Sequence, residues 1–175
     1  MTGVQTCALP IWSIDPLDAA LELILECELD VTMIDHYASE ATVRKIFVES
    51  GSLVGSDGIF GAKPHPRLFG SAARVLGRYA LSEKIIPLTE AVARLTSRPA
   101  DRLGLADRGR IAVGKRADLV LLDPDHFIDL ATYDEPTQHP GGVVLVMIAG
   151  EDVWTSNGHT GRLPGGVSRT ALAGV

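Results

Sequence analysis

Apolar residues in the first part of the chain recur at helical spacing behind two capping signals. Asp15 can cap free backbone N–H groups and Pro16 suits the first position of a helix, and the leucines, alanines and isoleucines that follow predict a helix over residues 16–28. Ser39 is typical of the cap of a second helix, whose apolar positions also fit a period of about 3.6 residues. Gly51 is expected to end this second helix.

Short β-prone runs alternate with these helices. Residues 31–34 and 52–55 each predict a strand, so the order along the chain is helix, strand, helix, strand. This alternation is typical of a parallel α/β unit with right-handed crossovers. Two more helices are predicted over residues 70–79 and 88–96, and a turn over residues 99–103 closes the helical part.

The pattern changes after Gly104, where turn residues and apolar runs replace helical periodicity. Leu119–Leu122 predicts a buried strand, and residues 143–148 predict another. Gly150 turns the chain back and predicts a hairpin with the residues that follow. Residues 158–175 are rich in glycine and are expected to be irregular. The tail of the chain is therefore predicted to be all β.

Composition and charge exclude several classes of protein. The chain has 175 residues and a net charge of -6, without a cluster of lysine and arginine, so nucleic acid is not an expected partner. Its longest apolar runs are far shorter than the roughly 20 residues of a membrane helix, so a membrane is not expected either. Cys7 and Cys27 lack metal-ligand spacing and predict neither a structural zinc site nor a disulfide. Cys27 is expected to fill a small apolar space inside a helix.

Residues 1–12 do not continue the pattern of the rest. They lack the basic start of a signal peptide, and Pro10 interrupts their short apolar stretch. The string from Gly3 to Ile11 resembles the translation of a sequencing adapter, so we expect residues 1–12 to be unstructured and foreign to the gene. On this interpretation the coding sequence continues upstream, and the protein is expected in the cytoplasm.

Four parts of the chain resemble a known family. They are Val54–Gly58, His65–Gly70 with Arg74–Tyr79, Leu95–Ala100 with Gly109–Val120, and Asn157–Gly165. The third resembles the tail of the amidohydrolase superfamily in general. The others resemble the D-aminoacylase branch of that superfamily, the N-acyl-D-amino-acid deacylases. The similarity covers nearly all of the chain after Asp15.

This resemblance implies an α/β fold, the C-terminal part of a metal-dependent (β/α)8 barrel with half of a small β-sandwich. Residues 13–103 would be the last strand–helix units of the barrel, residues 104–165 the sandwich segment, and residues 166–175 an irregular tail. A whole barrel takes about 250 residues, and the family's zinc ligands lie mainly on earlier strands. The resemblance thus implies that zinc belongs to the parent enzyme, and that this fragment alone neither binds zinc nor is active. Its partner would be the missing N-terminal part of its own barrel.

Asp57 is the best catalytic candidate. It follows the predicted strand 52–55, and the resemblance places it where the family keeps an aspartate at the end of the last barrel strand. A carboxylate at that place can take a proton from a metal-activated water and pass it to the leaving amine, and it is also a possible weak metal ligand. Ser56 offers a hydroxyl to the substrate. Without the flanking similarity, Ser56–Gly58 is more typical of a plain turn.

The loop over residues 59–68 supplies two substrate-binding candidates. The guanidinium of Arg67 matches the free carboxylate of an N-acyl amino acid, although a solvated arginine, or one that pins the loop by a hydrogen bond, is an equal alternative. His65 can donate to the substrate, orient Arg67 or pack the loop. His36 follows the first predicted strand and is expected to have a structural or supporting role. Surface positions are expected for three histidines of the tail, His126, His139 and His159.

The function implied by the resemblance is metal-dependent hydrolysis of N-acyl-D-amino acids, which gives a carboxylate and a free D-amino acid. The D preference follows from the resemblance alone. A cyclic-amide hydrolase, similar to hydantoinases or dihydroorotases, is the nearest alternative, and the segment from His65 to Arg67 argues mildly against it. A non-catalytic fragment is the alternative from another class, because the chain lacks the family's main metal ligands and has no HxH or HExxH pattern.

Overall fold

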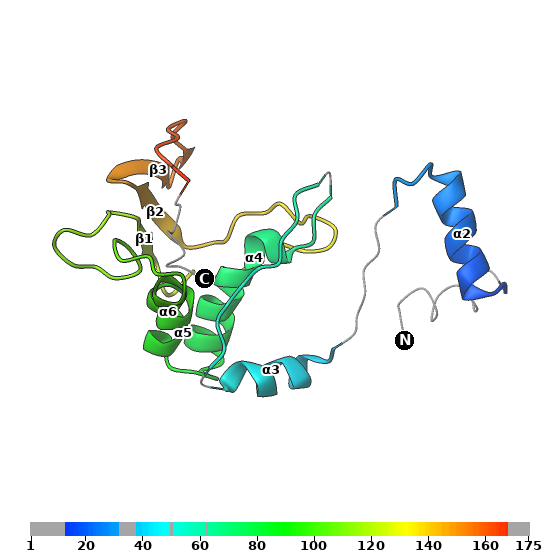
Figure 1. Ribbon diagram of the computed structural model, residues 1–175, viewed down its shortest axis with the longest axis horizontal. Helices are drawn as coiled ribbons and strands as arrows, with labels where there is room; N and C mark the ends of the chain where they lie inside the picture. Colours follow the sequence, from blue (N-terminus) through cyan, green and yellow to red (C-terminus); the bar gives the residue numbers. More distant parts are fainter. Residues whose placement is uncertain (1–12, 32–37, 50, 62, 168–175) are drawn as a thin grey trace, which may run out of the picture. The chain divides into compact units, whose positions relative to one another are not determined.

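The computed structural model describes residues 13–31, 38–49, 51–61 and 63–167 (Figure 1). The chain divides into two compact units, residues 1–49 and 50–175. The described part of the first unit holds helices, whereas the second unit holds helices and a sheet. Four sequence predictions fall wholly or partly outside the described residues, namely the adapter-like segment 1–12, most of the strand over residues 31–34, His36, and residues 168–175 of the irregular tail.

Both predicted helices of the first unit are confirmed. Helix α2 spans Pro16–Glu26, and the Asp15 carboxylate accepts a hydrogen bond from a backbone N–H of its first turn at 2.8 Å. Helix α3 spans Glu40–Val48, and the Ser39 hydroxyl accepts from a backbone N–H of its first turn at 3.2 Å. Each cap satisfies one of the N–H groups that a helix start leaves without a partner. Local sequence signals are therefore enough to place both helix starts.

Helix α2 ends earlier than predicted, and Cys27 does not lie inside it. The backbone enters the left-handed region at Glu28 and Leu29, with φ values of 49° and 72°, and a right-handed helix cannot continue through them. Cys27 caps the C-terminal end of α2 and is exposed. The expectation that Cys27 fills an apolar space is therefore wrong, because its position at the helix end leaves the side chain uncovered.

The predicted strand over residues 52–55 is not formed. The described residues 51–61 contain no strand, and every strand pair in the described part of the chain is antiparallel. A strand in a parallel sheet needs hydrogen bonds to neighbouring strands, whereas the contact that this segment makes is to a helix, from the Val54 N–H to the Arg94 carbonyl at 3.4 Å. Even-numbered residues from 52 to 58 are half-buried and their odd-numbered neighbours are exposed. The segment thus keeps the alternation of a strand without its pairing.

Four helical segments follow in the second unit. They are α4, Arg67–Ala73; the π-helix η1, Arg74–Ser82; α5, Leu88–Leu95; and α6, Ser97–Arg102. The helices predicted over residues 70–79 and 88–96 are confirmed, and the first is longer at both ends because α4 continues directly into η1. Within the described residues, none of the helices combines the length and the apolar character that a bilayer span requires.

Helix α6 replaces the predicted turn over residues 99–103. Pro99 is the third residue of this helix, where a backbone N–H would have no helical partner, so the proline costs no hydrogen bond there. The Leu103 N–H donates to the Pro99 carbonyl at 3.0 Å and closes the last turn. The turn prediction is therefore wrong, because it treated as a stop a proline that the first turn of a helix tolerates.

Small side chains on the helices build most of the core of the second unit. Its buried apolar residues are Ala73, Val75, Tyr79, Ala80, Ile86, Ala91 and Ala100, together with Phe127 and Val153 from the tail. Gly77 of η1 approaches the Phe127 carbonyl so closely that any side chain at position 77 would collide with it. The helices and the tail are therefore packed directly against each other.

The tail is all β, as predicted, and forms one antiparallel sheet in the order β1-β2-β3-β4. Val146 pairs with Val120 on one side and with Trp154 on the other. Ala149 and Gly150 turn the chain between β2 and β3 with φ values of 52° and 82°, as a tight hairpin requires, so the predicted hairpin is confirmed. The strands are β1, Leu119–Leu122; β2, Val143–Ile148; β3, Glu151–Thr155; and β4, Gly158–His159.

Two expectations for the sheet are wrong. Strand β1 is exposed rather than buried, with Val120 58% and Leu121 56% exposed. It is an edge strand, and its exposure means that no second layer covers it within the described residues. The region over residues 158–175 is not wholly irregular, because β4 pairs with β3 through His159 and Trp154.

We expect the isolated chain to aggregate or to remain molten. Large apolar side chains are uncovered at positions such as Phe60, which is 85% exposed, and β1 leaves an open sheet edge. The measurement is size-exclusion chromatography of the purified chain together with a thermal unfolding curve. A dispersed monomer with a sharp cooperative transition would contradict this prediction.

Two lysine substitutions in the sheet separate edge pairing from general instability. Val120→Lys places a charge on the exposed edge strand and should reduce aggregation. Val153→Lys is the matched control, because Val153 is 8% exposed and a charge there should worsen folding instead. If the two variants aggregate equally, the open edge of β1 is excluded as the cause of aggregation.

Candidate functional site

Asp57 lies in the extended segment that precedes α4, inside a local turn that is closed by the Ser56 side chain. Its backbone has φ of +47°, in the left-handed region that aspartate tolerates better than most residues. The Ser56 hydroxyl accepts a hydrogen bond from the Gly58 N–H at 3.3 Å and closes the turn below it. The Asp57 side chain is 84% exposed, so the turn presents the carboxylate to solvent. Ser56 therefore shapes this turn, which is compatible with both interpretations of the Ser-Asp-Gly sequence.

Gly58 allows this turn to touch the first turn of α4. A β-carbon built on Gly58 would lie 2.6 Å from Leu68 Cδ1 and 2.9 Å from Leu68 Cα, distances that side chains do not tolerate. The absence of a side chain at position 58 is therefore what permits the contact. Because Leu68 adjoins Arg67, the same close approach brings Arg67 next to Asp57.

Asp57 and Arg67 form an ion pair. Arg67 Nη2 lies 2.9 Å from Asp57 Oδ2, and the Arg67 side chain is 39% exposed. A pair with this much solvent contributes little to stability, at most about 1 kcal/mol. The structure thus brings together two of the residues that the sequence singled out, at positions ten apart in the chain. Both groups remain accessible to a small molecule.

One nitrogen of Arg67 is buried without a partner. Nε has no hydrogen-bond partner among the described residues, although Nη2 of the same guanidinium is paired with Asp57. A buried N–H without an acceptor is unfavourable, by about 1–3 kcal/mol. The guanidinium therefore has unused capacity for an acceptor such as a carboxylate oxygen.

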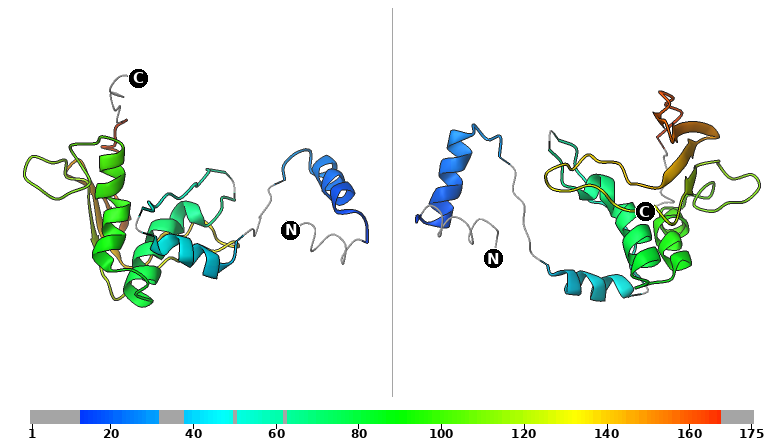
Figure 2. Two further views of the ribbon diagram at one scale, coloured as in Figure 1. Left: turned by 60° about the horizontal axis from the view of Figure 1, so that its bottom comes forward. Right: turned by 180° about the vertical axis from the view of Figure 1, so that it is seen from behind.

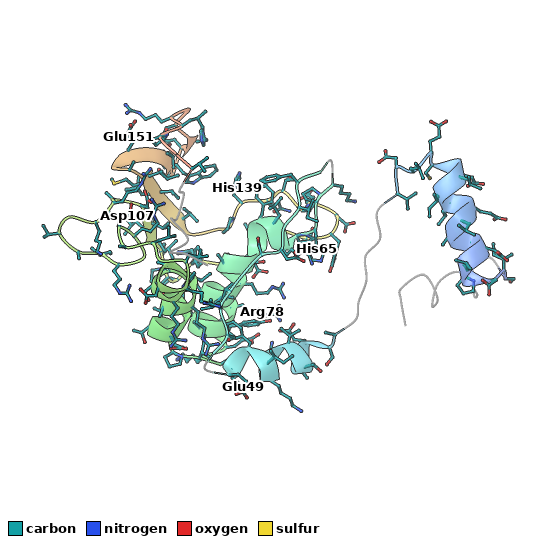
Figure 3. The ribbon with its side chains drawn as sticks, in the orientation of Figure 1. Glu49, His65, Arg78, Asp107, His139 and Glu151 are labelled. Atoms are coloured by element: carbon teal, nitrogen blue, oxygen red, sulfur yellow. The ribbon has the colours of Figure 1, made fainter. Side chains whose placement is uncertain are left out.

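His65 contacts both Arg67 and the tail. Its Nδ1 accepts a hydrogen bond from the Arg67 N–H at 3.0 Å, and its Nε2 lies 3.2 Å from the Tyr133 hydroxyl. The two rings meet edge to face, with centroids 5.2 Å apart and an angle of 81° between their planes. Figure 3 labels His65. His65 therefore packs the loop and bonds the backbone of Arg67, and its role toward the Arg67 guanidinium or a substrate stays a prediction.

Arg94 attaches the segment before Asp57 to helix α5. Its side chain is 2% exposed, and Nη1 donates to the Ser52 hydroxyl at 2.5 Å while Nε donates to Glu90 at 2.7 Å. Arg98 donates two further hydrogen bonds to the same carboxylate, at 2.7 and 2.8 Å. The hydrogen bond from Arg94, followed by the contacts of Arg98, lowers the pKa of Glu90 below its usual value. This cluster, in which Arg94 alone is buried, holds the stretch that leads to Asp57.

Sequence reasoning missed two contributors to this region, Arg94 and Tyr133. The spacing of Glu90 and Arg94 by four residues predicts a pair on one helix face. It says nothing about the bond to Ser52, which lies 42 positions away. Tyr133 is 68 positions from His65 and had no local signal that could have found it.

The histidines of the tail are exposed, as predicted. His126 pairs with Asp123 at 2.7 Å, and this hydrogen bond raises the pKa of His126 above its usual value. His139, labelled in Figure 3, packs against Phe69 and Trp154. The ring centroids lie 5.5 and 4.5 Å away. His159 is exposed on β4. None of these three histidines lies within a group of side chains that could bind a metal ion among the described residues.

The described part of the chain does not form a metal site by itself. Within it, no group of three or more histidine, cysteine, aspartate or glutamate side chains could hold an ion. Asp57 is an exposed carboxylate paired with a guanidinium, which makes it at most one donor to an ion held elsewhere. The geometry therefore supports proton transfer and anion binding at Asp57 and Arg67, and it assigns no metal-holding role to the other described residues.

Comparisons with known proteins identify the relatives of this chain. Residues 49–153 match the model of the Amidohydrolase family. The chain is 44% identical over 140 residues to an N-acyl-D-glutamate deacylase from Alcaligenes xylosoxydans xylosoxydans, covering 79% of the chain and 28% of that protein. It is 41% identical over 134 residues to a D-aminoacylase from the same organism, covering 75% of the chain and 28% of that protein.

A solved structure shares the fold as well. It is an N-acyl-D-glutamate deacylase from Bordetella bronchiseptica complexed with zinc and a phosphonate inhibitor, with a TM-score of 0.75 and 39% identity over 87% of this chain and 31% of that one. D-aminoacylase amidohydrolases are (β/α)8 barrels, so the predicted fold class is confirmed for a part of such a barrel. The chain spans about 28% of the length of these two curated relatives. Since the family match extends over more than half of its residues, this chain belongs to the amidohydrolase family.

Proposed function

We propose that this chain is part of a metal-dependent hydrolase that cleaves the amide bond of N-acyl-D-amino acids and releases a carboxylate and a free D-amino acid. The observation that carries this proposal is the Asp57–Arg67 pair, which holds a carboxylate and a guanidinium 2.9 Å apart. The names of the similar deacylases support the substrate class and the D configuration. The remainder of the barrel, with the main metal ligands, completes the active site in this proposal.

Asp57 is the general base and acid of the proposed reaction. Amide hydrolysis needs a nucleophile and a proton for the leaving nitrogen. A divalent metal, such as the zinc of the similar Bordetella deacylase, acidifies the attacking water when it is bound. The Asp57 carboxylate is exposed, so a water can reach it. It can take the proton of that water and return it to the nitrogen as the carbon–nitrogen bond breaks.

Arg67 binds the free carboxylate of the substrate. A carboxylate accepts from guanidinium N–H groups, and the Arg67 side chain is 39% exposed, so part of the guanidinium can be reached from solvent. In an N-acyl amino acid, a single carbon separates the carboxylate from the nitrogen of the scissile amide. The residue that binds the carboxylate must therefore lie next to the residue that protonates the nitrogen. The contact between Arg67 and Asp57 fits this requirement.

The test is an assay of the complete enzyme with N-acetyl-D-glutamate, its L enantiomer, other N-acetyl-D-amino acids and a hydantoin. We expect acetate to be released from D compounds, activity to disappear with a chelator, and zinc to restore it. A hydantoin carries no free carboxylate, so Arg67 would have no role in its hydrolysis. Cleavage of the hydantoin alone would overturn the proposed substrate class, and full activity in the chelator would overturn the metal dependence.

A further inference from the structure

The long connection between β1 and β2 reaches from the tail to the candidate site. Residues 123–142 leave the sheet, run alongside α4 and return to β2 (Figures 1 and 2). Arg74 lies 2.9 Å from Asp129 of this loop, and Asp129 is only 10% exposed, so the ion pair is well enclosed on one side. Further along the same loop, Tyr133 meets His65.

These contacts define which nitrogen of His65 carries the proton in the neutral imidazole. Nδ1 accepts from the Arg67 N–H, so it cannot carry a proton itself. The proton is therefore on Nε2, which donates to the Tyr133 oxygen at 3.2 Å. A continuous chain of hydrogen bonds thus runs from the Arg67 backbone through His65 to the tail.

The contact through His65 matters for Arg67 because few other interactions hold the N-terminal end of α4, where Arg67 lies. Pro66 precedes the helix and makes no side-chain cap. The Asp57 carboxylate that pairs with the Arg67 guanidinium is 84% exposed and constrains it only weakly. Arg67 and Arg74 are seven residues apart, on one face of the helical segment. The loop contacts Arg74 directly through Asp129 and reaches Arg67 only through His65.

We propose that Tyr133 is a positioning residue, which acts through His65 to hold Arg67 in place for the carboxylate of the substrate. This inference rests on the proposed function of Arg67. It means that the loop from the β tail determines how well the carboxylate is bound, although Tyr133 does not touch the substrate. A change in this loop is then a means of changing substrate affinity without altering the proton-transfer residue.

The first experiment compares Tyr133→Phe with wild type in the complete enzyme. Phenylalanine keeps the ring against His65 and removes the acceptor for Nε2. For an N-acyl-D-amino acid we expect KM to rise by about three- to tenfold, as for the loss of one hydrogen bond, with kcat nearly unchanged. For the same compound with an amide-capped carboxylate, KM should not change. Asp134→Asn, on the next residue of the same exposed loop, is the control and should behave as wild type.

The second experiment tests the path through the imidazole. Asparagine at position 65 can still accept from the N–H two residues on, but its shorter side chain cannot also reach Tyr133. His65→Asn should therefore raise KM as much as Tyr133→Phe does. The double variant should be no worse than either single variant, because all three break the same connection.

The possible outcomes separate this inference from the proposed function. If wild type cleaves N-acyl-D-amino acids and Tyr133→Phe leaves KM unchanged, the positioning role is overturned and the proposed function stands. Equal losses on both substrates, or effects of Tyr133→Phe and His65→Asn that simply add, would overturn it in favour of a structural role. If wild type cleaves no N-acyl amino acid, the proposed function fails and this inference fails with it.

Discussion

Replacing Asp57 with asparagine in the complete enzyme should lower kcat by about 10²–10⁴-fold, as expected for the loss of a general base. Asparagine keeps the shape of the side chain and tolerates the left-handed backbone at this position, where φ is +47°. It cannot accept the proton of the attacking water or return it to the leaving nitrogen. The turn should therefore survive the substitution while the chemical step fails.

The measurement is kcat and KM for both proteins, with their zinc content determined in parallel. KM should change little, because the interaction of Asp57 with the reacting atoms is made mainly in the transition state. Asp134→Asn serves as the matched control, since it removes an exposed carboxylate elsewhere in the same unit. A kcat close to wild type would remove Asp57 from the mechanism. A variant without zinc would instead make Asp57 a metal ligand.

Replacing Arg67 with alanine should weaken the binding of substrates that carry a free α-carboxylate by roughly 10–100-fold. A charge-assisted hydrogen bond contributes about 1.5–3 kcal/mol, which corresponds to this range. The loss of the ion pair with Asp57 should add little, because that carboxylate is 84% exposed. The measurement is KM for an N-acyl-D-amino acid and for its amide-capped analogue, and the capped compound should lose much less.

Arg67→Lys provides the control for charge alone. Lysine keeps a positive charge but cannot offer two parallel N–H groups to one carboxylate. We therefore expect an intermediate KM, between those of wild type and of Arg67→Ala. An equal loss on both substrates in all variants would show that Arg67 supports the loop rather than the substrate. That result would also favour the alternative in which Arg67 only pins the loop, because its contact with Asp57 is enough to hold the loop.

The elements that the sequence predicts correctly depend on neighbours along the chain. Asp15 and Ser39 mark the starts of α2 and α3 because each cap bonds a backbone N–H in the following turn. The hairpin at Gly150 is equally local. The candidate residues Asp57 and Arg67 were singled out through the resemblance to a known family rather than by local signals. They lie ten positions apart, and the close contact at Gly58 brings them together.

Two of the predictions that are wrong concern segments whose state depends on partners far away. The run over residues 52–55 has the composition of a strand, but hydrogen bonds from neighbouring strands decide whether a strand forms, and the described residues offer it a helix instead. The apolar run of β1 forms its strand and yet stays exposed, because burial needs a second layer that the described residues lack.

By itself, the sequence determined the helix starts and the hairpin, and its resemblance to a known family singled out the pair of residues proposed to carry the chemistry. Only the tertiary structure decided what holds that pair in place. Ser52 bonds to Arg94 across 42 positions and His65 bonds to Tyr133 across 68 positions. The physical reason is that hydrogen bonds and ring contacts act over a few ångströms of space, whereas periodicity and capping signals extend over only a few residues of sequence.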